Sequence, residues 1–272
     1  MSRSCRSGIQ AEVDLAALEQ RLGGRLGVAL LGAEGATLLS HRANERFAMC
    51  STFKLALAAA ILDVEEEGGL SPDEVVTFGR DDMVPYSPVV EPLLAEGRVT
   101  LGQLTEAIVT ISDNTAANLL LARVDGPEGL TAFIRANGDA VTRLDRTEPT
   151  LNENVPGDPR DTTSPAAMAA LTRRLIEGDT LSETNRGRLF DWTVASTTGL
   201  QRIRAGLPPE WPVGDKTGSC GTAYNDIAII RAPGRDTAIL TVYIDRPTAE
   251  EDAVFAAMAQ VGRIAAQRLG AR

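Results

Sequence analysis

The stretch Met49-Cys50-Ser51-Thr52-Phe53-Lys54, MCSTFK, holds one of only two lysines among the 27 basic residues of this 272-residue chain. The apolar run that follows it, residues 55–62, has the length and composition of a buried helix, and we predict a helix over residues 51–63. On such a helix Lys54 lies one turn after Ser51 on the same face, so that its amine approaches the Ser51 hydroxyl. The stretch therefore predicts two polar side chains held together at the start of a buried helix.

This pair has the chemistry of a nucleophile and its base. Apolar surroundings disfavour an ammonium and lower its pKa, so that Lys54 can release a proton where an arginine in practice cannot. The helix N-terminus also favours negative charge that develops near Ser51. The stretch alone leaves a second interpretation open, in which Ser51 is an N-cap and Lys54 extends from an ordinary helix toward solvent.

Composition excludes several other classes of protein. The formal net charge of -10 and the lack of a basic run argue against a nucleic-acid partner. The longest apolar run is too short to span a bilayer, and the first residues, MSRSCRSGIQAEVD, lack the apolar core of a signal peptide. One histidine and cysteines only at positions 5, 50 and 220 do not supply the ligand clusters of a zinc site. We therefore expect no metal or other cofactor, no nucleic acid and no membrane span.

The order of predicted elements indicates a mixed α/β fold. A helix at residues 14–22 precedes a hairpin of two apolar segments, and three further strands lie near the other end of the chain. The hairpin strands are predicted at residues 26–31 and 36–40, and the later strands at 212–219, 226–232 and 237–244. A final amphipathic helix follows, with a capping box from Thr248 to Glu251. We expect one sheet built from both chain ends.

The middle of the chain is predicted to be a helical lobe, with capped helix starts at Thr100 and Ser164. We place the domain boundaries accordingly, with a discontinuous α/β lobe over residues 8–44 and 196–272 and an all-α lobe over residues 45–195. The helical lobe includes an irregular segment, residues 143–161, that has no periodicity and contains three prolines. Irregular connections of that length are usually functional or disordered.

Two further motifs decide between the interpretations of Ser51 and Lys54. Ser112-Asp113-Asn114 closes the helix that starts near Thr100, and Lys216-Thr217-Gly218 lies on a predicted strand and holds the other lysine. Each motif alone is ordinary, because Ser-Asp-Asn is a common helix stop and Lys-Thr-Gly is typical of an exposed strand end. In this order, S-x-x-K, S-D-N and K-T-G are the signature of class A β-lactamases and penicillin-binding proteins. The chain resembles the class A β-lactamases from about residue 15 to residue 269.

The resemblance implies the family's fold, an antiparallel sheet with flanking helices and an inserted all-α lobe, and a mechanism. Ser51 would attack a β-lactam carbonyl, and Ser112 would pass a proton to the leaving nitrogen. Glu148-Pro149-Thr150-Leu151-Asn152 resembles the omega-loop motif, in which a glutamate and an asparagine hold the water that hydrolyses the acyl-enzyme. Both Lys54 and Glu148 remain candidates for the acylation base.

The omega loop carries two further expectations from the resemblance. Arg146 and Asp161 match the ion pair that closes the family's loop, and the peptide bond between Glu148 and Pro149 is expected to be cis.

The resemblance also implies which residues bind the substrate. The backbone amides of Ser51 and Ser219 would form the oxyanion hole. The substrate carboxylate would be held by Lys216, Thr217 and Ser219, with Arg202 supporting the carboxylate pocket. Asn114 and Asn152 are further substrate-binding candidates, Asn114 for the acylamino group, and Tyr86 resembles the aromatic residue at the rim of the cleft. As a lone arginine, Arg202 is more often a surface residue, and its assignment rests on the resemblance and on how well a guanidinium suits a carboxylate.

A disulfide between Cys50 and Cys220 is a further implication of the resemblance, because a minority of class A enzymes have such a bridge and several of those hydrolyse carbapenems. It would leave Cys5 as a free thiol. The alternative is that Cys50 is a small buried apolar residue and Cys220 an unrelated thiol. A structural disulfide indicates an oxidising compartment, so we expect a periplasmic or secreted protein.

Two related activities remain as alternatives, a cell-wall DD-peptidase or penicillin-binding protein and a β-lactam sensor that stays acylated. Both share the serine and lysine machinery, but neither is expected to carry the Glu148 to Asn152 motif. A Ser-His-Asp triad would depend entirely on His41, which we expect to be a surface or loop-packing residue. We expect a monomer that binds small β-lactam substrates and inhibitors, with a substrate spectrum that the sequence does not give.

Overall fold

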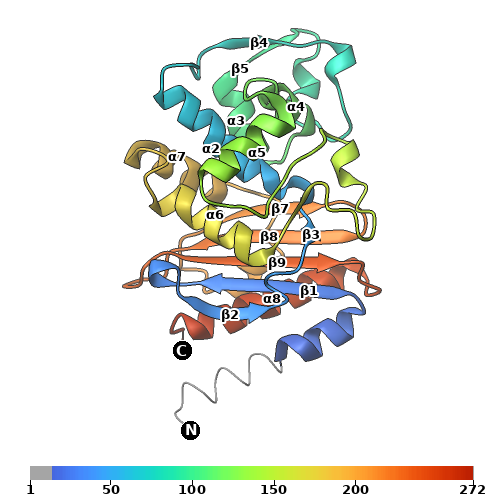
Figure 1. Cartoon of the computed structure of the whole chain (residues 1–272), viewed down its shortest axis with the longest axis vertical. Helices are drawn as coiled ribbons and strands as arrows, with labels where there is room; N and C mark the ends of the chain where they lie inside the picture. The colour runs from blue at the N-terminus through green and yellow to red at the C-terminus, as the bar shows by residue number, and fades with distance from the viewer. Residues whose placement is uncertain (1–13, 272) are drawn as a thin grey trace.

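The β-sheet is built from both ends of the chain, as predicted, in a computed structural model that describes residues 14–271 (Figure 1). Its strand order is β2-β1-β9-β8-β7, and every neighbouring pair is antiparallel. The five strands of this sheet are β1 (Arg25–Leu31), β2 (Thr37–His41), β7 (Val213–Ser219), β8 (Ala223–Ile230) and β9 (Ala238–Asp245).

Both faces of the sheet are covered by helices, and a hydrophobic core lies on each face. Alternate residues of β9 belong to the two cores: Leu240 and Val242 pack toward helix α8 (Glu251–Arg268), whereas Ile239 and Tyr243 pack toward α6 (Pro165–Glu177). This alternation is the period of two that a strand imposes on its side chains. A helix at residues 14–22 joins α8 on the same face (Figure 1).

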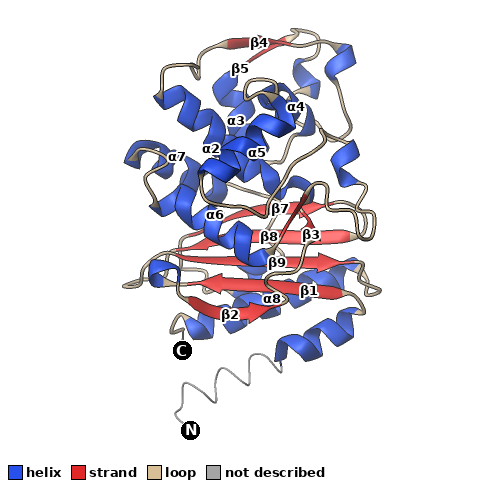
Figure 2. Cartoon of the chain, viewed as in Figure 1, coloured by secondary structure: helices blue, strands red, loops and turns tan. Residues whose placement is uncertain are grey.

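The helical lobe surrounds helix α2 (Phe53–Glu66) (Figure 2). Residues 53–62 of α2 are all buried, and a helix that is buried all round lies in the middle of a core. The other helices of this region in the described residues are α3 (Leu101–Thr110), α4 (Asn114–Leu121), α5 (Gly126–Ala136) and α7 (Glu183–Val194). The sequence predicted this centre, since it is the apolar run that follows MCSTFK.

Two short strand pairs complete the described structure. β3 (Phe47–Ala48) pairs with β6 (Thr162–Thr163), and β4 (Val75–Thr77) pairs with β5 (Arg98–Thr100). The first pair joins the segment before Ser51 to the end of the omega loop, and the amide of Met49 adds a hydrogen bond to the carbonyl of Asp161. The nucleophile segment and the omega loop are therefore fixed to each other through the backbone.

The predicted helix starts at Thr100 and Ser164 are confirmed, but the capping box of the last helix is wrong. Thr100 accepts from the amide of Gln103, and Ser164 accepts from the amide of Ala167. Helix α8 instead has Glu250 as its N-cap, with no side-chain capping bond. The amides of residues 248 and 249 both donate to the carbonyl of Leu22, so this segment is tied to the first helix and α8 begins only after it.

Two predicted boundaries also differ. Strand β8 begins at Ala223 rather than at residue 226, because the polar Tyr224 and Asn225 pair with the end of β7 although they interrupt the apolar run. Ser51 lies in a 3₁₀ turn, Cys50–Thr52, that leads into α2, and the helix continues to Glu66. The division into two lobes stays a prediction, and its residues 8–13 and 272 lie outside the described part of the chain. Across residues 14–271, no helix has the length and apolar character that a membrane crossing requires.

Candidate active site

The nucleophile candidate Ser51 lies in a tight turn pressed against strand β7. A Cβ atom added to Gly218 would lie 2.6 Å from the carbonyl oxygen of Met49 and 3.0 Å from the amide nitrogen of Ser51, so only glycine allows this approach. Cys50, directly before the nucleophile, has a positive φ of 46°. A left-handed conformation in a residue other than glycine is strained, and such strain concentrates at functional sites. The turn therefore holds Ser51 against the strand that carries K-T-G.

Lys54 approaches Ser51 as predicted. Its Nζ lies 3.1 Å from Oγ of Ser51, 2.9 Å from the carbonyl oxygen of Ser112 and 2.5 Å from Oδ1 of Asn114. Burial lowers the pKa of Lys54, while the negative charge of Glu148 acts in the opposite direction. The interpretation of Lys54 as a helix residue whose side chain extends toward solvent is wrong, because that side chain is fully buried.

Glu148 reaches the same amine from the omega loop. Its Oε1 lies 3.1 Å from Nζ of Lys54, an ion-pair distance without hydrogen-bond geometry, and both side chains are fully buried. Oε2 of Glu148 accepts from Nδ2 of Asn152 at 2.6 Å. Asn118 on α4 exchanges two hydrogen bonds of 2.9 Å with the backbone of Glu148 and so fixes its position. The loop glutamate and the helix lysine therefore meet beside Ser51.

Ser112 lies between the two lysines of the chain. Nζ of Lys216 is 3.0 Å from its Oγ, and Nζ of Lys54 is 3.5 Å from the same atom. Burial lowers the pKa of Lys216 well below its ordinary value, and the positive charge of Lys54 lowers it further. Ser112 also has a positive φ of 66°. A hydroxyl flanked by two buried amines is suited to receive and pass on a proton.

The rim of the site is formed by the segment before Val89. Asn114 donates from Nδ2 to the carbonyl of Pro85, and its amide donates to the carbonyl of Tyr86. Asp113 accepts from the amides of Val89 and the next residue at 2.9 and 3.0 Å. The Ser-Asp-Asn motif thus holds Tyr86 at the edge, where 57% of that residue is exposed.

The opposite end of the site combines hydroxyls with a buried guanidinium. Arg202 is 7% exposed and donates to Oγ of Ser219 and to the carbonyl of Asn225, both at 2.7 Å. Its guanidinium lies 4.8 Å from the ring centre of Phe255. In the described part of the chain no carboxylate oxygen lies within 4.0 Å of it, and burial lowers its pKa. Thr217 shares a 2.7 Å hydrogen bond with Thr198 beside it.

A pocket of about 550 Å³ brings these groups together. It is lined by eight of the residues predicted from the sequence, Ser51, Tyr86, Ser112, Asn114, Asn152, Arg202, Thr217 and Ser219. The fully buried side chains of Lys54, Glu148 and Lys216 reach the lining residues through the contacts given above. His41 does not line it and instead lies 3.1 Å from a carboxylate oxygen of Glu19. The described residues 14–271 contain no cluster of three or more His, Cys, Asp or Glu that could hold a metal.

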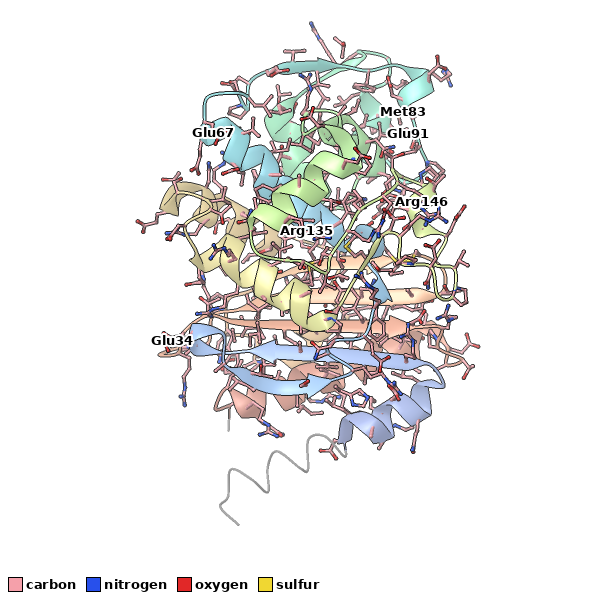
Figure 3. The ribbon with its side chains drawn as sticks, viewed as in Figure 1. Glu34, Glu67, Met83, Glu91, Arg135 and Arg146 are labelled. Atoms are coloured by element: carbon pink, nitrogen blue, oxygen red, sulfur yellow. A yellow bond between two sulfur atoms is a disulfide. The ribbon has the colours of Figure 1, made fainter. Side chains whose placement is uncertain are left out.

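The omega loop is closed as predicted. Nε of Arg146, which is labelled in Figure 3, lies 2.6 Å from Oδ2 of Asp161, which is almost fully buried. Oδ1 of that aspartate accepts from the amides of Asp145 and Arg146. The peptide bond between Glu148 and Pro149 is cis. The loop is less irregular than predicted, because residues Thr150–Asn152 form a 3₁₀ turn that brings Asn152 back to Glu148.

The disulfide between Cys50 and Cys220 is confirmed, and Cys5 lies outside the described residues. The bridge joins the nucleophile turn to the residue after β7. Asn225, which sequence reasoning missed, adds two hydrogen bonds from Nδ2 to the carbonyls of Ala48 and Met49. Asn118 was also missed, although its position four residues after Asn114 placed it on the same helix face.

The disulfide supports a prediction on thiol content and stability. Titration of the denatured, unreduced protein should find one free thiol, and reduction should raise this number to three. Because the bridge spans 170 residues, its loss should lower the free energy of unfolding by up to about 5 kcal/mol. Chemical denaturation with and without reductant measures this change. Three thiols before reduction would contradict the bridge.

The fold and the site together define a serine acyl-transfer hydrolase. A serine hydroxyl faces a buried amine, a second serine lies between two amines, and a buried glutamate reaches the same amine from a loop.

Comparison with known proteins gives the family. The model of the β-lactamase enzyme family matches residues 10–269. The chain is 48% identical to β-lactamase CTX-M-8 of Citrobacter amalonaticus, over 91% of this chain and 86% of the relative. It is 42% identical to the carbapenem-hydrolyzing β-lactamase KPC of Klebsiella oxytoca, over 94% of this chain and 87% of the relative. Among solved structures, the ancestral (GNCA) class A β-lactamase superposes with a TM-score of 0.91 at 53% identity, covering 94% of this chain and 98% of that chain.

The chain therefore belongs to the β-lactamase enzyme family and is a class A serine β-lactamase. It hydrolyses the amide of the β-lactam ring, an activity that gives resistance to these antibiotics.

Proposed function

We propose that Ser51 is the nucleophile and that Lys54 and Glu148 form the base system that activates it. The short distances from Nζ of Lys54 to Ser51 and Glu148 support a path for the hydroxyl proton. Burial shifts Lys54 toward its neutral form, which can accept a proton. Attack on the β-lactam carbonyl forms the acyl-serine, and the amides of Ser51 and Ser219 stabilise the oxyanion.

Ser112 completes the acylation step. The leaving lactam nitrogen needs a proton when the ring opens, and Oγ of Ser112 is the hydroxyl placed between the two lysines. Lys54, once it has taken the proton of Ser51, and the amine of Lys216 are placed to stabilise negative charge on this oxygen while it passes the proton on. Lys216 therefore acts through Ser112 and also attracts the substrate carboxylate.

Deacylation is assigned to Glu148 with Asn152. Oε1 of Glu148 and Oδ1 of Asn152 are buried acceptors that receive no hydrogen bond from the protein. Two such acceptors beside the nucleophile are suited to bind and orient a water, and the carboxylate can take its proton as it attacks the acyl-serine. This pair of acceptors is the observation that carries the proposal, because it provides for turnover of the acyl-enzyme.

The substrates proposed are penicillins, cephalosporins and carbapenems. Thr217, Ser219 and Arg202 would hold the carboxylate that these compounds share, while Asn114 binds the acylamino group and Tyr86 contacts the substrate at the rim. Carbapenems are included because the relative KPC is named as carbapenem-hydrolyzing and because the Cys50–Cys220 bridge resembles that of several such enzymes. The protein is proposed to act as an exported monomer, in the periplasm or outside the cell, without a nucleic-acid partner.

Turnover tests the proposed function. We expect a chromogenic cephalosporin, a penicillin and a carbapenem each to be hydrolysed well beyond one equivalent per enzyme, the carbapenem most slowly. The assay counts product in the first turnover and in the steady state. A burst of one equivalent with no further product would instead indicate a β-lactam sensor or a penicillin-binding protein. If only the carbapenem were not hydrolysed, only that substrate class would be removed from the proposal.

A further inference from the structure

A group of buried charged residues lies behind the Arg202 end of the pocket. Asp215 on β7 and Asp226 on β8 are both completely buried. In the register of these strands Thr217 is opposite Asp226. Residues opposite each other share a face of the sheet, and so do residues two apart on one strand. Asp215 and Asp226 are therefore diagonal neighbours on one face.

This face packs against the segment that carries Arg202. Oδ2 of Asp226 accepts from the amide of Ile203 at 3.2 Å. Oδ2 of Asp215 lies 3.0 Å from Nε of Arg204. A Cβ atom added to Gly199 would lie 2.4 Å from the same oxygen, so the segment approaches as closely as a glycine permits. Asp226 thus binds the backbone directly after Arg202, and Asp215 pairs with the side chain of Arg204 and packs against Gly199.

If both aspartates are ionised, this group has more acceptor oxygens than hydrogen-bond donors. Oδ1 of Asp226 and both oxygens of Asp215 are buried and receive no hydrogen bond of regular geometry, although Arg204 pairs with Oδ2 of Asp215 and Ser196 is a further donor beside that carboxyl. Buried ionised oxygens without donors are costly, whereas a protonated carboxyl supplies one donor. Burial raises the pKa of both groups, and the charge of Asp215 raises that of Asp226 further, while Arg204 favours the ionised form of Asp215.

We propose that Asp215 and Asp226 hold one proton between them, carried on Asp226, and that this pair positions Arg202 to bind the substrate carboxylate. The inference rests on the proposed role of Arg202. In this arrangement Oδ1 of Asp226 becomes the donor available to the carboxylate of Asp215. Asp215 keeps its charge opposite Arg204, and Oδ2 of Asp226 still accepts from Ile203.

Charged groups on every neighbouring element have to be considered for a pH test. They are Arg202 and Arg204 on the packed segment, Lys216 on β7, Tyr224 on β8, Tyr243 on β9 and Glu250 and Glu251 on α8. Burial and Glu251, to which the hydroxyl of Tyr224 donates, raise the pKa of Tyr224. All of these residues are present in both proteins, so their contributions cancel except where they depend on the charge of Asp226 itself. The difference between wild type and Asp226→Asn therefore reports on Asp226.

The pH dependence of stability follows from the proton on Asp226. The folded state keeps a proton that the unfolded chain releases above its ordinary pKa of 3.8. The stability due to this group is present below that pH and is lost as pH rises toward the folded pKa. An asparagine mimics the protonated carboxyl at every pH. Asp226→Asn should therefore match wild type near pH 4 and gain stability relative to it up to pH 8, with a slope of about one proton.

Denaturant unfolding of both proteins at several pH values between 4 and 8 measures this difference. A relative loss of stability in Asp226→Asn as pH rises would overturn the shared proton, because it would mean that an ionised Asp226 stabilises the fold. A difference that stays constant with pH would overturn it as well.

Steady-state kinetics test the positioning role. Asp226→Ala removes the acceptor of the Ile203 amide, so the KM for a penicillin should rise about tenfold with a smaller change in kcat. Asp226→Asn keeps an acceptor oxygen and should hold KM within about twofold of wild type. If Asp226→Ala does not fold, a tenfold rise in KM for Asp226→Asn would overturn the positioning role.

Arg202→Gln separates this inference from the proposed function. It should raise KM at least as much as Asp226→Ala does. If Arg202→Gln leaves KM unchanged, the role proposed for Arg202 fails, and the positioning inference fails with it. If Arg202→Gln raises KM and Asp226→Ala does not, only the positioning inference is overturned.

Discussion

Glu148→Gln should still acylate, because Lys54 remains as a base beside Ser51, and should then stall, with deacylation slowed about 1,000-fold. The glutamine keeps the size of the side chain and an oxygen at the loop position, but it cannot take a proton from water. The groups that contact Ser51 and Ser112 directly are unchanged by this substitution. Intact mass spectrometry after mixing with a penicillin should therefore show a persistent adduct of one equivalent.

The same substitution at a glutamate outside the pocket controls for the loss of one carboxylate as such. Glu34→Gln changes an exposed glutamate on the turn between β1 and β2, which lines no part of the pocket (Figure 3). This variant should turn over penicillin at the wild-type rate and show no lasting adduct. Wild-type turnover by Glu148→Gln would remove Glu148 from the deacylation step.

Lys54→Arg should fold but lose acylation activity by about 100- to 10,000-fold. The charge beside Glu148 is retained, but a guanidinium does not release a proton at any working pH. Wild-type Lys54 can do so because burial lowers its pKa. Stopped-flow measurement of the first turnover separates this effect from deacylation. Unchanged acylation would leave Lys54 as a structural charge only.

The other lysine of the chain is the natural control for this substitution. Lys216→Arg keeps a permanent positive charge near Ser112, and attraction of a carboxylate needs only that charge. It should retain more acylation activity than Lys54→Arg. If both substitutions had the same effect, the two lysines would share a purely electrostatic role.

The sequence predicted the central helix, the mixed sheet and the residues that meet in the pocket, because each depends on a strong local signal. The apolar run after MCSTFK could only be buried. The order of the three motifs then identified the family, and with it Glu148 and the Cys50–Cys220 bridge. Ser51 and Lys54 could be recognised from the sequence alone because they lie one helical turn apart.

Other features could not be predicted because they depend on contacts between distant segments. Asn225 looks like a break in an apolar strand, yet its side chain holds the carbonyls before Ser51. The capping pattern from Thr248 to Glu251 is present in the sequence, but the hydrogen bonds to Leu22 prevail over it. Asp226 gives no signal of its own in the sequence, since its burial beside Asp215 follows from strand register.

Peptide mapping of the trapped adduct tests the central claim most directly, namely that one serine is acylated and one loop glutamate releases it. Glu148→Gln mixed with a penicillin, quenched and digested should carry the added mass on the peptide that contains Ser51, and Ser51→Ala in the same background should carry none. An adduct on the peptide that contains Ser112, or an adduct that persists without Ser51, would contradict the account.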